Sequence, residues 1–87
     1  MKAAVWDTYV QRPSGSVMHF DIVVDACTKD KEAVIKYGQE YLLSKGLNNL
    51  DIRVEYCSFC HIEQATPVME KDIRDRGFYI IEMENCN

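Results

Sequence analysis

The sequence lacks an excess of positive charge. Ten Lys and Arg residues stand against fourteen Asp and Glu residues, and the net charge at pH 7 is −4. The basic residues are scattered among acidic neighbours, as in residues 29–32 and 72–76. Binding to the nucleic-acid backbone requires a basic stripe that displaces counterions. We therefore expect no nucleic acid among the partners.

The sequence also lacks a long apolar run. No segment approaches the ~20 consecutive apolar residues that a membrane-spanning helix needs. Asp7 interrupts the apolar stretch at the N-terminus, where an export signal would need a continuous one. We therefore expect no membrane partner and a cytoplasmic location. In that reducing compartment, the four cysteines are more typical of metal ligands or free thiols than of disulfides.

Familiar catalytic motifs are missing as well. The chain has no Gly-rich phosphate loop, no G-x-S-x-G elbow and no H-E-x-x-H pair. No pattern indicates a substrate, and we therefore do not expect an enzyme. An enzyme would draw its catalytic groups from Asp7, His19 and Asp21, which are considered below.

The composition is that of a small folded domain. Of the 87 residues, 47% are hydrophobic and 28% are charged, so we expect a single domain over residues 1–87. A domain of this size buries only about 60–65% of the surface that its unfolded chain exposes. A bound metal or a second chain would therefore contribute noticeably to stability.

The first third of the chain predicts a β-hairpin. Residues 3–10 are rich in β-branched and aromatic residues, and residues 17–25 alternate between apolar and polar. Pro13 and Gly15 suit a three-residue loop with a bulge between the two strands. This loop sets a register that pairs Val10 with Met18, Tyr9 with His19, Thr8 with Phe20, Asp7 with Asp21, and Trp6 with Ile22.

The remaining elements alternate between helix and strand. They are predicted as a helix over 29–45 capped by Thr28, a strand over 50–57, a helix over 67–76 capped by Thr66, and a strand over 78–83. The resulting order, ββαβαβ, favours an α/β (α+β) fold. We expect a two-layer sandwich in which a mixed four-stranded sheet carries the two helices on one face.

The cysteines suggest a metal site. Cys57 ends the strand over 50–57, Cys60 and His61 follow within one loop, and Cys86 follows the last strand. If these two strands form a βαβ unit, they run parallel and their ends meet at one edge of the sheet. Three thiolates and an imidazole are a common tetrahedral zinc set. We therefore expect zinc as a cofactor, with Cys57, Cys60, His61 and Cys86 as its ligands.

Three other interpretations of the motif stay open. Covalent haem needs an export route and a distal ligand, and the candidates Met69 and Met83 fit core positions, so no haem is expected. A redox C-x-x-C normally lies at a helix N-terminus, whereas the next helix begins only at Pro67. Alternatively, the cysteines are small buried apolar residues and His61 lies on the surface.

The hairpin register produces a second constellation. Asp7 lies opposite Asp21, and Tyr9 lies opposite His19 beside them. Like charges that face each other across two strands are destabilising. Two carboxylates and a histidine can hold a divalent ion or transfer a proton. Alternatively, Asp7, Tyr9, His19 and Asp21 form a solvated face, or a binding face that a second copy of the chain covers in a homo-oligomer.

Four ordered blocks of the sequence resemble a known family. They are Asp7-Thr8-Tyr9-Val10, Met18-His19-Phe20-Asp21, Cys57-x-x-Cys60-His61 and Met83-Glu84-Asn85-Cys86-Asn87. Together they are similar to the bacterial domain-of-unknown-function family numbered two thousand and twenty-four (DUF2024), nearly end to end. The resemblance implies a compact α/β domain and carries no activity. The family pattern has Gly where this chain has Asn85, a residue that tolerates a left-handed backbone.

Overall fold

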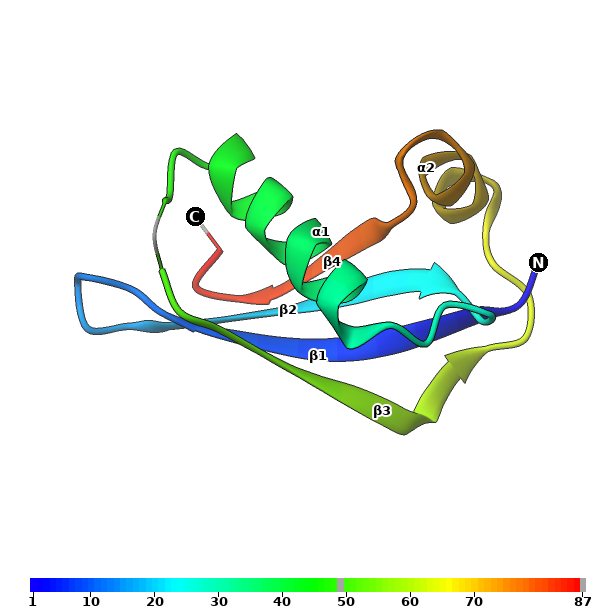
Figure 1. Cartoon of the computed structure of the whole chain (residues 1–87), viewed down its shortest axis with the longest axis horizontal. Coiled ribbons are helices and arrows are strands. Elements are labelled where there is room, and N and C mark those ends of the chain that lie inside the picture. The colour runs from blue at the N-terminus through cyan, green and yellow to red at the C-terminus, as the bar shows by residue number, and fades with distance from the viewer. Residues whose placement is uncertain (49, 87) are drawn as a thin grey trace.

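The computed structural model describes residues 1–48 and 50–86, with the side chains of Ser58 and Phe59 left aside. The chain forms an α+β fold with the predicted ββαβαβ order (Figure 1). The elements are β1 (Ala3–Gln11), β2 (Val17–Asp25), α1 (Lys31–Ser44), β3 (Ile52–Ile62), α2 (Pro67–Arg76) and β4 (Tyr79–Glu84). Among the described residues, no helix is both long and apolar enough to cross a membrane.

The β1–β2 hairpin has the predicted register. Each of the five predicted pairs, from Val10 with Met18 to Trp6 with Ile22, is present. The amide of Arg12 donates to the carbonyl of Ser16 at 2.8 Å, which closes the three-residue loop. Gly15 has a φ of 96°, a conformation that glycine adopts without steric cost. Local turn chemistry therefore determined which side chains face each other.

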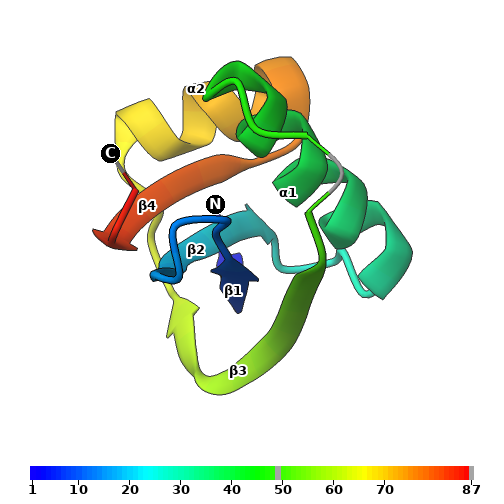
Figure 2. The same cartoon turned by 90° about the vertical axis from the view of Figure 1, so that its left-hand side faces the viewer.

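The sheet is antiparallel throughout, not mixed. Its strand order is β3-β1-β2-β4, and each neighbouring pair runs antiparallel. The expectation that β3 and β4 are parallel neighbours is therefore wrong, since they form opposite edges (Figure 2). The chain leaves β3 and enters β4 at the same end of the sheet, where α2 lies (Figure 1). A parallel crossover would need a helix that carries the chain back along the strands.

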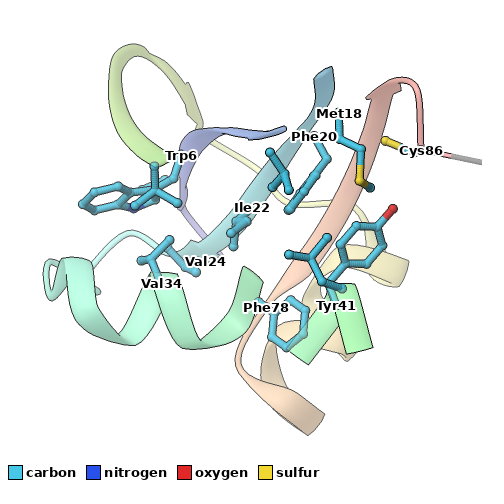
Figure 3. Close-up of a cluster of buried hydrophobic side chains, with 13 residues drawn as sticks. Trp6, Met18, Phe20, Ile22, Val24, Val34, Tyr41, Phe78 and Cys86 are labelled. Atoms are coloured by element: carbon cyan, nitrogen blue, oxygen red, sulfur yellow. The ribbon is translucent and has the colours of Figure 1, made fainter. Parts of the chain in front are cut away.

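The main core lies between α1 and one face of the sheet (Figure 3). Successive residues of a strand point to opposite faces, and this face carries the even-numbered residues of the hairpin. Trp6, Phe20 and Ile22 pack there against Val34 and Tyr41 of α1. Phe20 is fully buried, and its ring centroid lies 4.6 Å from that of Tyr41.

The second helix, α2, packs against the opposite face of the sheet. Ile73 of α2 packs in a separate buried cluster with Ala3, Val5 and Val23, whose odd-numbered positions face away from α1. The expectation that both helices lie on one face is therefore wrong. The strands are apolar at consecutive positions at this end, so both faces need cover there. Beyond the end that α2 covers, the second face carries polar residues, among them Asp7 and His19.

Several boundaries differ from those predicted. The N-cap of α1 is Asp30, which accepts a hydrogen bond from the Glu32 amide at 3.0 Å, and not Thr28. The C-terminal boundary of β3 is Ile62, so the cysteine motif lies inside a strand and not in a loop after it. The cap of α2 is Thr66, as predicted. Asn85 has a φ of 55°, so it adopts the left-handed turn that its place in the sequence suggested.

Candidate functional site

The four residues of the predicted zinc set do not meet. Cys57 and Cys60 are joined by a disulfide within β3, contrary to the expectation of reduced thiols. Cys86 is buried beyond β4, at the opposite edge, where its thiol donates to the carbonyl of His19 at 3.3 Å. Three strand spacings, about 14 Å, separate these edges. His61 is half exposed and lies 3.3 Å from a carboxylate oxygen of Glu63.

The second constellation does come together. The hairpin register places Asp7 directly opposite Asp21, and His19 lies two residues from Asp21 in β2 and therefore on the same face. His19 Nε2 lies 3.5 Å from Asp7 Oδ1 and 3.7 Å from Asp21 Oδ1. One ligand atom from each of the three side chains lies within 4.8 Å of the other two. A search of the described residues for clustered Asp, Glu, His and Cys ligand atoms finds this group, whose spacing could hold a metal ion.

The cluster is largely withdrawn from water. The exposed fractions of the side chains are 32% for Asp7, 21% for His19 and 16% for Asp21. The His19 Nε2 and Asp21 Oδ1 atoms are both buried, and neither has a hydrogen-bond partner in the described part of the chain. Buried polar atoms are normally paired, and leaving one unpaired costs about 1–3 kcal/mol. These two atoms therefore offer unused coordination to a ligand.

The titration of Asp21 reflects this environment. The pKa of Asp21 is raised from 3.8 to about 6, and burial is the largest cause. A hydrogen bond with Asp7 and the negative charge of Asp7 contribute to the rise, whereas the nearby His19 opposes it. Two carboxylates held close together resist double ionisation. A cation between them would remove this repulsion.

An aromatic stack positions the histidine. The rings of Tyr9 and His19 are nearly parallel, with centroids 4.5 Å apart and an interplanar angle of 10°. The guanidinium of Arg53, on β3, lies 5.4 Å from the centroid of the Tyr9 ring. Tyr9 therefore restricts the rotation of the imidazole and belongs to the predicted binding face. Self-association through this face stays a prediction.

The spacing of the ligand atoms suits a small divalent ion. Zinc binds imidazole nitrogen and carboxylate oxygen at about 2.0–2.2 Å, and tetrahedral geometry then separates the ligand atoms by about 3.3–3.6 Å. The distances from His19 Nε2 to Asp7 Oδ1 and Asp21 Oδ1, 3.5 and 3.7 Å, lie close to this range. The two carboxylate oxygens of the group lie within 4.8 Å of each other.

Comparisons with known proteins agree with this fold. The family model described as "Domain of unknown function (DUF2024)" matches residues 1–83. The chain belongs to this family. The DUF2024 domain is also similar to the NMR structure of protein NE1680 from Nitrosomonas europaea, with a TM-score of 0.80, 32% sequence identity and full coverage of both chains. A comparison with curated proteins finds no match. Asn87, the end of the fourth sequence block, lies outside the described residues.

One contact of the candidate site, that between Arg53 and Tyr9, could not be predicted from the sequence. Arg53 lies opposite Tyr9 because β3 pairs with β1, and this pairing depends on the strand order. The sequence alone places Arg53 in a strand but does not indicate its neighbour. Asp7, Tyr9, His19 and Asp21 could be grouped from sequence, because a single short hairpin carries all four.

The raised pKa of Asp21 predicts that ionisation of this side chain lowers the folding stability of the apo protein at higher pH. Because the folded pKa lies above 3.8, the folded state holds this proton more tightly than the unfolded chain. The resulting contribution to stability is complete below about pH 4 and is lost as the pH rises through 6. We expect Asp21→Asn to stabilise the apo protein by about 1–2 kcal/mol at pH 7.5 and to change little near pH 4. Urea unfolding at both pH values measures the difference, and an equal effect at both would contradict the assignment to charge.

Proposed function

We propose that this domain binds a divalent transition-metal ion, zinc in the first place, through Asp7, His19 and Asp21. One observation carries the proposal. Two buried atoms that lack a hydrogen-bond partner among the described residues, His19 Nε2 and Asp21 Oδ1, lie within 4.8 Å of each other and of an Asp7 oxygen. A cation at this point would pair all three groups at once.

The protonation states favour binding near neutral pH. A metal ligand must be deprotonated, so a carboxylate has to be ionised and an imidazole neutral. With a pKa of about 6, Asp21 is mostly ionised at pH 7 and mostly protonated at pH 5. Metal binding should therefore weaken as the pH falls through 6. With an aspartate of ordinary pKa, the weakening would occur only at a lower pH.

The donor set narrows the class of metal. Imidazole together with carboxylates suits zinc, manganese, cobalt and nickel, whereas calcium and magnesium prefer oxygen ligands alone. Three protein ligands leave at least one coordination position open to water or to another ligand. The open position is compatible with a further binding partner and does not by itself indicate a reaction.

A zinc titration distinguishes this site from the cysteine motif. Protein stripped with a chelator is titrated with zinc by calorimetry at pH 7.5, both as the wild type and as a Cys57→Ser/Cys60→Ser double variant. We expect one zinc per chain, with similar affinity in both, because neither cysteine lies at the proposed site. Failure of the wild type to bind zinc would overturn the proposal. Loss of binding only in the double variant would favour the cysteine motif instead.

A further inference from the structure

The disulfide between Cys57 and Cys60 spans the start of a large bulge in β3. Two pairs with β1 flank this bulge, namely Val5 with Cys57 and Ala3 with Ile62. Between these pairs β1 contributes one residue, Ala4, whereas β3 contributes four, residues 58–61. We call these four residues the β3 bulge. Figure 1 shows the strand turning toward α2 near its C-terminal end, where the β3 bulge lies.

The β3 bulge is held at both ends by contacts that involve neither sulfur. On its near side, Cys57 is paired with β1 through the backbone. On its far side, Ile62 packs in the buried cluster that contains Ala3. The amide of Ala65 then donates to the carbonyl of Met1 at 2.8 Å. The two cysteines should therefore stay close together when the bond between them is broken, in position to form it again.

The disulfide closes a very short loop of the chain. Cys57 and Cys60 are three positions apart in the sequence. A disulfide stabilises a protein mainly by restricting the unfolded chain, and this effect is smallest for the shortest loops. We therefore expect the fold to depend little on this bond, so that the bond can be made and broken while the rest of the domain stays folded.

The cysteine pair is accessible from one side. Cys60 is exposed, whereas Cys57 is half-buried. In the described part of the chain, β3 is an edge strand, with β1 as its only neighbour in the sheet. Thiol–disulfide exchange begins when a thiolate reaches one sulfur of the bond, so access determines which sulfur is attacked. The exposed Cys60 is the accessible end of this disulfide.

We propose that Cys57 and Cys60 form a thiol–disulfide exchange site that takes a small thiol of the glutathione class as its substrate. The thiolate of one substrate molecule attacks Cys60 Sγ and forms a mixed disulfide, and Cys57 leaves as a thiolate that takes a proton from water. A second substrate thiolate attacks the substrate sulfur of the mixed disulfide, and Cys60 leaves and is protonated in turn. Two electrons thus pass to the protein disulfide, which becomes two thiols, while two substrate thiols become one disulfide. The oxidised substrate reverses the reaction.

The position of the pair distinguishes this site from a thioredoxin-like one. In such enzymes the C-x-x-C motif begins a helix, whose N-terminus stabilises the reactive thiolate. Here β3 continues to Ile62, and α2 begins only at Pro67. No helix therefore starts at the pair to stabilise a thiolate. We expect the site to equilibrate with small thiols and not to oxidise other proteins rapidly.

Reduction and re-oxidation of the purified protein test the proposal. A Cys27→Ser variant removes the exposed free thiol, and a chelator keeps metal ions away from the reduced cysteines. Glutathione is added at pH 7.5, and free thiols are then blocked with N-ethylmaleimide and located by mass spectrometry. We expect blocked thiols at Cys57 and Cys60, and their loss once oxidised glutathione is supplied. A disulfide that resists excess glutathione, as structural disulfides do, or that does not re-form, would overturn the proposal.

The amide NMR spectrum separates an exchange site from a structural disulfide. We expect reduction to shift the resonances of residues around the β3 bulge and to leave those of α1 and of the hairpin loop in place. Loss of the dispersed spectrum on reduction would show that the fold depends on the bond, and this result would also overturn the proposal.

Two further variants identify the sulfur that is attacked. In the Cys27→Ser background, Cys57→Ser leaves the exposed Cys60, and Cys60→Ser leaves the half-buried Cys57. Both keep the buried Cys86 as an internal baseline. We expect the Cys60 thiol to react with oxidised glutathione at least about fivefold faster than the Cys57 thiol. An equal or slower reaction of Cys60 would contradict its assignment as the attacked sulfur.

Discussion

Replacing His19 with alanine should weaken zinc binding at least about a hundredfold, whereas replacing His61 should leave it unchanged. His19 supplies the one nitrogen ligand of the proposed site, and its Nε2 lies within 3.7 Å of both carboxylates. Loss of a group that merely supports a ligand already costs 10–100-fold in affinity. Loss of a ligand itself should cost at least as much.

The two histidines form a matched pair of variants. They are the only histidines in the chain, and each lies in a strand next to a carboxylate. The exposed fraction of the side chain is 21% for His19 and 50% for His61. Calorimetric titration of both variants with zinc at pH 7.5 gives the comparison. A larger loss of zinc affinity for His61→Ala than for His19→Ala would favour a site at the cysteine motif and contradict the assignment.

A second substitution separates ligation from folding. His19→Ala also removes the ring that stacks on Tyr9, so part of its effect could come from local rearrangement. Asp7→Asn keeps the size of the side chain and removes the charge that a metal would use. We expect this variant to keep the melting temperature of the apo protein within a few degrees and to bind zinc at least about tenfold more weakly. Unchanged affinity would exclude Asp7 from the site.

Phe20→Ala should destabilise the domain by about 3–5 kcal/mol. Phe20 is fully buried between β2 and α1, where it packs against Tyr41. Proteins gain roughly 0.05–0.15 kcal/mol of stability per residue, which amounts to about 4–13 kcal/mol for a chain of 87 residues. The substitution therefore removes a large part of the total, and many molecules would be unfolded at 37 °C.

The measurement is urea unfolding followed by circular dichroism. Val17→Ala is the matched control, because Val17 begins the same strand but is 43% exposed. Its expected effect is below about 1 kcal/mol. A loss below about 1.5 kcal/mol for Phe20→Ala would mean that the core around α1 is less tightly packed than the structure shows.

Short-range features of this chain could be predicted from the sequence. Pro13 and Gly15 define the hairpin loop, and the loop fixes the register that places Asp7, His19 and Asp21 together. Thr66, Pro67 and Gly77 bound α2 as predicted. These features depend on backbone preferences and on hydrogen bonds between residues a few positions apart. They can therefore be predicted from the local sequence alone.

Only the tertiary structure decided how the elements are assembled. β3 pairs with β1 and β4 pairs with β2, so the two later strands form opposite edges of the sheet. This order separates Cys86 from Cys57, places Arg53 beside Tyr9 and lets Tyr56 face Trp6. Each edge of the hairpin could accept either strand by hydrogen bonding alone. The choice depends on which arrangement buries the apolar residues of both faces, and that energy is a property of the whole packed chain.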